Sequence, residues 1–205
     1  MSEFDSPGLH AAILAAGPST RFGSPKQLLR LAGTPVLHQA IANAALVAGH
    51  SITVVLGSGA RDVSPALRQS AVAIEVNRDW EEGLASSIRA AVRSAPPGCE
   101  GLLLVLADQV AVTGDDLQRL YAAWRRHPVL IAAALYGGAP GLPAIFPRWV
   151  FPDLLDLRGD RDPRLVIRRN VDQVVRVPMR SAAVDLNTPQ DLLEMQATAA
   201  GRAQP

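Results

Sequence analysis

The sequence is poor in cysteine, lysine and aromatic residues, and the first of these shortages excludes whole classes of site. Its 205 residues include one cysteine, Cys99, which lies beside Pro97 and Gly98 in a predicted loop. A single cysteine excludes an intrachain disulfide framework and a cysteine-based metal site. The four histidines show no ligand-like pairing, so we interpret them as ordinary surface or core residues.

Long apolar runs and an excess of one charge are also missing. No run approaches the length that crosses a membrane, and residues 1–8 are acidic and polar, unlike a signal peptide. The formal net charge is +1 with both signs mixed along the chain, which argues against nucleic acid or an anionic membrane as the main partner. We expect a cytoplasmic protein, in a reducing compartment, with a small charged ligand.

Aromatic residues make up 4% of the chain. Nothing interleaves the three tryptophans, Trp80, Trp124 and Trp149, with basic residues as in surfaces that stack on bases. We interpret them as core anchors.

Short apolar runs alternate with amphipathic stretches. The most apolar run, 102–107, is typical of a strand covered on both faces. The alternation predicts an α/β fold, a three-layer sandwich with a mostly parallel sheet and right-handed crossovers. No linker interrupts it, so we expect a single domain over 1–205, with an ordered core at about 9–196 and tails at 1–8 and 197–205. The predicted strands are 9–14, 52–56, 72–76, 102–107, 129–135 and 174–177; the predicted helices are 35–48, 84–93, 115–127, 149–157, 164–169 and 189–195, with a weak one after Arg61 and irregular chain at 136–143.

The only lysine, Lys26, closes a glycine-bearing loop that follows the first predicted strand. The loop reads Leu14-Ala-Ala-Gly17-Pro-Ser19-Thr-Arg21-Phe-Gly23-Ser-Pro-Lys26, and the other nineteen basic residues of the chain are arginine. Backbone N–H groups with two fixed cations, Arg21 and Lys26, suit a polyphosphate. An ordinary tight turn is the alternative. The full spacing, with the sole lysine at its end, favours catalysis.

Two acidic residues are candidate metal ligands. Asp108 ends the most apolar strand, and ligands of open α/β sheets bind at the carboxyl ends of strands, so Asp108 is expected to face the loop. A carboxylate beside a polyphosphate needs a cation, which suggests Mg²⁺. Asp185, with Asn187 two residues later, is the second candidate. Helix capping is the alternative for both aspartates. Together these features suit attack on the α-phosphorus of a nucleoside triphosphate, with pyrophosphate leaving.

The loop Leu14-Ala-Ala-Gly17-x-Ser19-x-Arg21-x-Gly23-x-x-Lys26 resembles the signature of the molybdenum-cofactor nucleotidyltransferases. Segments 77–88, 106–109, 141–146 and 157–160 resemble further parts of that family, the last two its acceptor-side loops. The resemblance implies a Rossmann-like nucleotidyltransferase fold, Mg²⁺ held by Asp108 and Asp185, and catalysis by Arg21, Lys26 and Asp108. It implies nucleotide contacts from Leu14, Ala15, Ala16, Gly17, Ser19, Arg21, Lys26, Asn77, Gly83, Ser86, Ser87 and Gln109.

Leu-Ala-Ala-Gly in the loop and Asp-Gln at 108–109 are typical of the family's cytidylyl branch. The resemblance therefore implies CTP as substrate and molybdopterin as acceptor. The product would be molybdopterin cytosine dinucleotide, used by molybdenum hydroxylases of the xanthine dehydrogenase type. Departures are Val110 in place of the usual proline, Asn187, which is usual in the guanylyl branch, and Asp162-Pro163 in place of Gly-Ala.

Several alternatives stay open. One is a guanylyl- or other nucleotidyltransferase with a different phosphate acceptor, and another is a non-catalytic accessory protein that delivers the cofactor to a hydroxylase. Ser86 and Ser87 also suit ordinary first-turn residues of a helix. The arginines between 158 and 169 suit an anionic acceptor, although we interpret Arg168 and Arg169 as a solvated helix face.

Overall fold

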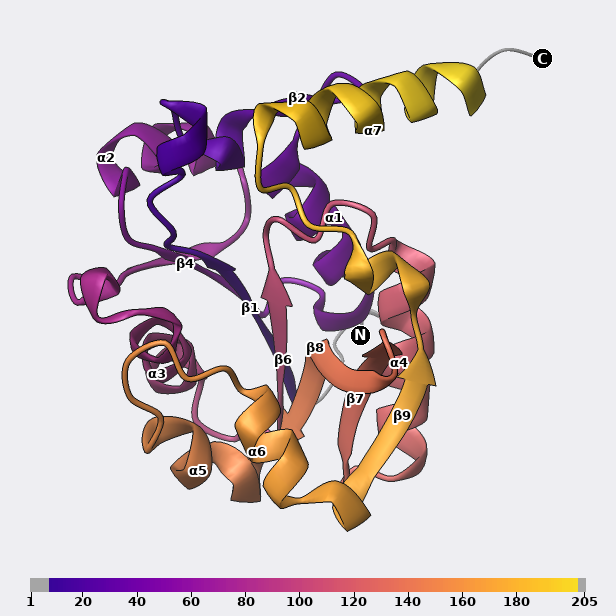
Figure 1. Cartoon of the computed structure of the whole chain (residues 1–205). Coiled ribbons are helices and arrows are strands. Elements are labelled where there is room, and N and C mark those ends of the chain that lie inside the picture. Colours follow the sequence, from indigo (N-terminus) through magenta and orange to yellow (C-terminus); the bar gives the residue numbers. More distant parts are fainter. Residues whose placement is uncertain (1–7, 203–205) are drawn as a thin grey trace.

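A computed structural model describes residues 8–202, and Figure 1 shows a twisted sheet with helices on both of its faces. The sheet has seven strands in the order β5-β4-β1-β6-β8-β7-β9. All of them run parallel except β8, which is antiparallel to both of its neighbours. The predicted α/β fold with a mostly parallel sheet is confirmed. The strands are β1 (Leu9–Ala15), β4 (Ile52–Leu56), β5 (Ala73–Val76), β6 (Gly101–Leu106), β7 (Ile131–Tyr136), β8 (Ala139–Pro147) and β9 (Val174–Pro178).

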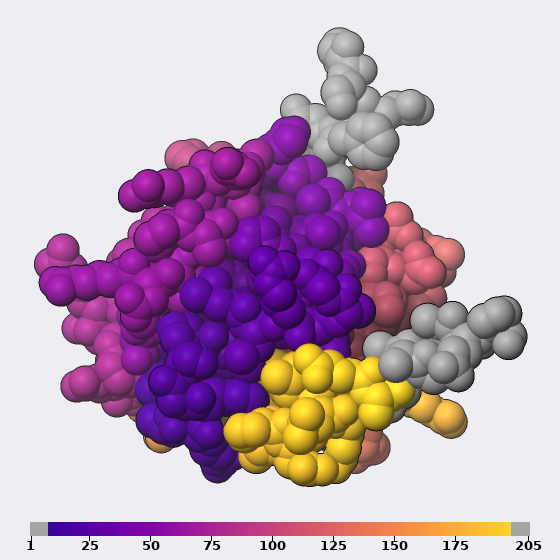
Figure 2. Space-filling view, turned by 90° about the horizontal axis from the view of Figure 1, so that it is seen from above, coloured from indigo at the N-terminus to yellow at the C-terminus, as the bar shows by residue number. Residues whose placement is uncertain are grey.

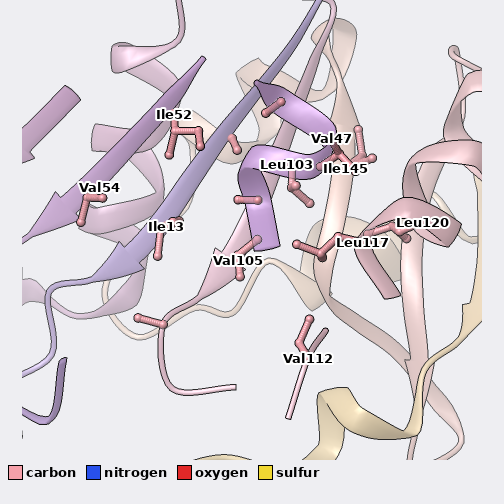
Figure 3. Close-up of a cluster of buried hydrophobic side chains, with 14 of the residues drawn as sticks. Ile13, Val47, Ile52, Val54, Leu103, Val105, Val112, Leu117, Leu120 and Ile145 are labelled. Atoms are coloured by element: carbon pink, nitrogen blue, oxygen red, sulfur yellow. The ribbon is translucent and has the colours of Figure 1, made fainter. Parts of the chain in front are cut away.

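The core consists of two apolar layers, one on each face of the sheet. Helices α1 (Val36–Ala48) and α4 (Gly114–Arg126) cover one face, and α3 (Leu84–Ser94), α5 (Phe151–Leu155) and α6 (Arg164–Arg169) cover the other. Alternate residues of β6 point to opposite layers, Leu103 to the first and Leu104 to the second. Figure 3 shows the first layer, with Leu103 and Val105 of β6 near Leu117 of α4. The apolar run at 102–107 is therefore buried on both faces, as predicted.

The region 136–143, predicted to be irregular, is mostly strand. Chain reversal occurs at Gly137 and Gly138, both with positive φ (56° and 79°), and β8 then inserts between β6 and β7. Glycine and proline are depleted in strands. Because this region is rich in both residues, the sequence pattern did not predict β8.

The C-terminal helix α7 (Pro189–Arg202) is longer than predicted. The ordered core was expected to end near 196, but the alanine-rich continuation has high helix propensity and the helix runs on. Gln196 Nε2 donates to the carbonyl oxygen of Arg30 at 3.2 Å, in the small hairpin of β2 (Arg30–Leu31) and β3 (Thr34–Pro35). Figure 2 shows α7 in yellow directly beside the indigo N-terminal region. Of the predicted tails, residues 1–7 and 203–205 lie outside the described residues.

The remaining helix is α2 (Ala60–Val63), where a weak helix was predicted. None of the helices within residues 8–202 is long and apolar enough to cross a membrane.

Candidate active site

A hollow that many of the predicted site residues line lies where the strand order reverses. Strand β1 pairs with β4 along one edge and with β6 along its other edge. The carboxyl ends of β1 and β6 therefore form a crevice at this point of the sheet. A cavity of about 250 Å³ occupies it. Many of the predicted site residues line this cavity: Leu14, Ala15, Ala16, Gly17, Lys26, Gly83, Ser87 and Asp108. Ser19, Arg21, Lys26 and Asn187 line an adjoining hollow of about 170 Å³.

The loop after β1 is closed by a glutamine that the sequence analysis missed. Gln27 is only 2% exposed, and its Nε2 donates to the carbonyl oxygen of Ala15 at 2.8 Å. Ser19, with φ 51°, accepts a bond at its Oγ from the backbone N–H of Lys26 at 3.1 Å. These two contacts fold the loop back on itself, which brings Lys26 to the cavity. The only sequence signal for Gln27 is its place directly after the lysine.

Lys26 contacts both acidic segments of the site. Its Nζ lies 2.5 Å from Asp108 Oδ2 and 3.4 Å from the carbonyl oxygen of Leu186. The backbone N–H of Leu186 in turn donates to the carbonyl oxygen of Asp108 at 2.9 Å. The structure therefore brings the late segment that carries Asp185 to the end of β6, beside Asp108.

Asp185 lies within electrostatic range of Asp108. Desolvation of its carboxyl and the negative charge of Asp108 raise the pKa of Asp185, while the positive charges of Lys26 and Arg164 act against the rise. A carboxylate whose charge is disfavoured by a second carboxylate nearby suits a hard divalent cation, which commonly takes one or two carboxylates and completes its shell with substrate phosphates and water. Residues 8–202 contain no cluster of three or more histidine, cysteine or acidic side chains that could hold a metal ion.

Neither aspartate serves as a helix cap. Thr113 caps α4 in a reciprocal arrangement with Asp116. At α7, Thr188 Oγ1 accepts from the N–H of Asp191, whose carboxylate accepts from the N–H groups of Asn187 and Thr188. The capping alternative for Asp108 and Asp185 is thereby removed.

The predicted nucleotide contacts around 77–87 divide into two groups. Gly83 and Ser87 line the cavity, whereas Asn77 and Ser86 lie behind its wall. Asn77 is 6% exposed, and its Nδ2 donates to Ser86 Oγ at 2.8 Å and to Ser87 Oγ at 3.1 Å. Ser86 Oγ donates to the carbonyl oxygen of Gly83 at 2.8 Å. Asn77 and Ser86 therefore position the first turn of α3.

The loop 157–160, which the resemblance assigns to the acceptor side, reaches the cavity lined by the loop after β1. Asp160 and Gly83 both line the cavity. The φ of Gly83 is 113°, which favours glycine. A Cβ at this position would also clash with Asp160 Oδ1. Arg89, 8% exposed in α3, pairs with Glu82 and donates to the carbonyl oxygen of Leu157 at 2.8 Å. The hydrogen bond from Arg89, then that from the Gly159 N–H, lower the pKa of Glu82 to about 2. No sequence signal pointed to Arg89.

Gln109 does not line the cavity beside the loop that follows β1. Its side chain is 4% exposed, and Nε2 donates to the carbonyl oxygens of Leu142 at 2.9 Å and Ala182 at 2.8 Å. Asp108 lines the cavity, whereas the adjacent Gln109 side chain is buried against these two carbonyl oxygens. These contacts give Gln109 a structural role, and the nucleotide contact that the resemblance implies for it stays a prediction.

The tryptophans also differ from expectation. Trp124 is 1% exposed and is a core anchor, as predicted. Trp149 is 43% exposed, and Trp80 lines the cavity beside Gly83. Trp80 is placed there because it begins a short turn, Trp80–Glu82, that leads directly into Gly83 and α3.

Comparison with known proteins identifies the family. Residues 11–174 match the family described as the MobA-like NTP transferase domain. The chain belongs to this family. Purine catabolism protein PucB of Bacillus subtilis is 28% identical over 198 residues, which cover 91% of this chain and 95% of PucB. The bifunctional protein GlmU of Xanthobacter autotrophicus is 30% identical over 159 residues, which cover 75% of this chain but only 35% of GlmU.

Solved structures of several other proteins are similar to this chain. The structure of an Rv0371c homologue from Mycobacterium sp. strain JC1 has a TM-score of 0.82 and 30% identity, covering 95% of this chain and 98% of that one. Mycobacterium tuberculosis Rv0371c in complex with manganese has a TM-score of 0.77 and 26% identity, covering 93% and 98%. Molybdopterin-guanine dinucleotide biosynthesis protein A of Archaeoglobus fulgidus shares the fold, with a TM-score of 0.68 at 17% identity, covering 94% and 99%. The chain is a nucleotidyltransferase with the Rossmann-like fold of that class.

Proposed function

We propose that the protein transfers CMP from CTP to molybdopterin with the help of Mg²⁺, giving molybdopterin cytosine dinucleotide and pyrophosphate. The observation that carries this proposal is the contact of Lys26 with Asp108 at the cavity beside the ends of β1 and β6, with Asp185 within electrostatic range of both. The Leu14-Ala-Ala-Gly17 loop and the Asp108-Gln109 pair support CTP as the nucleotide, through their resemblance to the cytidylyl branch.

The two sides of the cavity suit the two parts of a nucleotide. Lys26, Arg21 and the N–H groups of the loop would bind the triphosphate, and Trp80, Gly83 and Ser87 would enclose the nucleoside. Asp108 and Asp185 would hold the metal, which when bound neutralises and polarises the phosphates. In-line attack by an acceptor phosphate oxygen forms the new bond to the α-phosphorus as the bond to the leaving pyrophosphate breaks. Lys26 and Arg21 then stabilise the charge on the pyrophosphate.

A molybdenum hydroxylase of the xanthine dehydrogenase type is the proposed user of the product. Support comes from the similarity along almost the full length of PucB, a protein named for purine catabolism. A hydroxylase of this type acting on a purine fits that name.

The direct test measures pyrophosphate release from purified protein with molybdopterin, Mg²⁺ or Mn²⁺, and each of the four ribonucleoside triphosphates in turn. We expect release with CTP that depends on the metal. Turnover with GTP but not with CTP would contradict the choice of base. If every triphosphate fails, maturation of a hydroxylase by Lys26→Met and Asp108→Asn variants decides between catalysis and cofactor delivery, because delivery alone does not need these two side chains.

A further inference from the structure

Arg164, the first residue of α6, is held in one orientation by contacts on the acceptor side of the site. Its Nη2 donates to the hydroxyl oxygen of Tyr136 at 2.6 Å, and its Cζ lies 5.2 Å from the centre of the Tyr136 ring. A guanidinium that lies over a tyrosine ring and also donates a hydrogen bond to the hydroxyl oxygen of that tyrosine has few other conformations. The guanidinium is therefore fixed before any ligand binds.

Gly141 of β8 provides the space in which Arg164 lies. A Cβ at Gly141 would lie 2.7 Å from Arg164 Nε and 2.8 Å from the hydroxyl oxygen of Tyr136, closer than real Cβ contacts come. Arg164 therefore rests directly on the backbone of β8, at the start of the Gly141-x-Pro143 segment. Its side chain is still 42% exposed, so a ligand can reach it.

The positive charge of Arg164 is only weakly neutralised. Its one ion pair within residues 8–202 is with Asp162, at 3.9 Å between Nε and Oδ2, and the Asp162 side chain is itself 46% exposed. In the described part of the chain no hydrogen bond engages Nη1. Water-exposed pairs at this distance contribute little, so one edge of the guanidinium is available for a stronger anion.

Arg164 and Lys26 approach the end of β6 from opposite sides. Lys26 follows β1 and contacts Asp108, whereas Arg164 lies over β8, and β6 lies between β1 and β8 in the sheet. The charge of Arg164 also acts on Asp185. In an in-line displacement the leaving pyrophosphate and the incoming acceptor lie on opposite sides of the α-phosphorus. With Lys26 on the triphosphate side, Arg164 is the cation on the acceptor side.

We propose that Arg164, oriented by Tyr136 over Gly141, binds the phosphate group of a phosphate-monoester acceptor. The proposal rests on the proposed function, in that it assigns the second substrate of the same site. A guanidinium fork matches phosphate oxygens in two parallel hydrogen bonds, and the anion would replace the weak contact with Asp162.

The test is calorimetric titration of inorganic phosphate into the protein in the presence of Mg²⁺, with the triphosphate site filled by α,β-methylene-CTP. We expect phosphate to bind the wild-type complex and Arg164→Met to weaken this binding by about tenfold or more, with the affinity for the analogue unchanged. Arg164→Lys should recover part of the affinity. Tyr136→Phe, which keeps the ring and loses the hydroxyl, should show a smaller loss. Arg168→Met, an exposed arginine of the same helix, is the matched control and should bind phosphate as the wild type does.

Phosphate binding that is absent from the wild type, or equal in wild type and Arg164→Met, overturns the proposal. A parallel loss of phosphate and analogue binding in Arg164→Met also overturns it, because the residue would then maintain the site as a whole. If the wild type does not bind the analogue, the proposed function fails instead, and the same comparison made on the free protein still reports on Arg164.

Discussion

Two buried glutamines support the two sides of the site, and they act over very different distances along the chain. Gln27 bonds the carbonyl oxygen of Ala15, 12 residues away. Gln109 bonds the carbonyl oxygens of Leu142 and Ala182, which are 33 and 73 residues away. The side that we propose for the nucleotide, called the nucleotide side below, is thus a locally closed loop, whereas the side proposed for the acceptor, the acceptor side, is assembled from three distant segments.

The acceptor side has a second long-range contact. Asp116, in the first turn of α4, accepts a hydrogen bond from Ser181 Oγ at 2.7 Å. With Gln109 it fixes the segment that leads into Asp185. A change on the nucleotide side should therefore act on nucleotide binding, and a change on the acceptor side should act on the metal site and the acceptor.

The largest effect is expected at Asp108, where the two sides meet. Asp108→Asn removes the partner of Lys26 and a proposed metal ligand while leaving the fold intact, so the rate of CTP-dependent pyrophosphate release should fall by about 10³. The matched control is Asp79→Asn, an exposed carboxylate outside the cavity, which should retain the wild-type rate. A loss of less than about tenfold at Asp108 would remove it from the catalytic set.

The independence of the two sides is tested by Gln27→Met and Gln109→Met. Each substitution leaves buried carbonyl oxygens without a donor and should lower the free energy of unfolding by about 1–3 kcal/mol, measured in urea. Gln27→Met should weaken α,β-methylene-CTP binding by about tenfold and leave intrinsic Mn²⁺ affinity unchanged; Gln109→Met should do the reverse. If both variants weaken both ligands equally, the two sides are one cooperative unit.

The local contacts of the nucleotide side and the long-range contacts of the acceptor side explain why the sequence predicted the first side better than the second. The loop from Leu14 to Lys26 follows its strand directly, so its position needed only the rule that ligands gather at strand ends, and this rule also placed Asp108 opposite it. Gln27, whose hydrogen bond to Ala15 closes the loop, was missed because a single buried amide produces no recognisable pattern in one sequence.

The acceptor side was predicted less well because its geometry depends on β8. That strand carries glycine and proline where strands usually have β-branched residues, and its place between β6 and β7 follows from pairing, not from local preference. The inward turn of Gln109 depends on carbonyl oxygens from β8 and from the segment before Asp185. The position of Asp160 depends on Arg89, a buried charge in α3 that hydrophobic periodicity does not predict.

A moderate effect is expected at Asp116. Burial of this carboxyl acts to raise its pKa, but hydrogen bonds from Ser181, Thr113 and Arg119 outweigh burial and hold the pKa of Asp116 below its usual range. A lowered folded-state pKa contributes stability that is complete above the unfolded-state pKa and is lost as the pH falls through the folded-state pKa. Asp116→Asn should therefore reduce the free energy of unfolding by about 1–2 kcal/mol at neutral pH and by much less at a pH below both pKa values.

Urea unfolding across this pH range checks the prediction, with the exposed neighbour Asp115→Asn as control. A difference between wild type and Asp116→Asn that does not change with pH would show that the ionised carboxylate is not the stabilising form. Asp116→Asn should also weaken Mn²⁺ binding without affecting the CTP analogue, since Asp116 fixes the acceptor side only.

The smallest effect is expected at Trp80, which makes the nucleotide side visible in solution. Trp80 lines the cavity, whereas Trp124 is buried and Trp149 is exposed elsewhere, so binding of α,β-methylene-CTP should change the emission of Trp80 alone. Trp80→Phe should abolish that change and weaken the analogue by roughly threefold, since an aromatic contact contributes about 0.5–1.5 kcal/mol. Trp149→Phe should preserve both. Phosphate added to the wild-type complex should leave the emission unchanged, because its proposed site lies beyond β6 over β8, and a change in emission on adding phosphate would mean that the two sides are not separate.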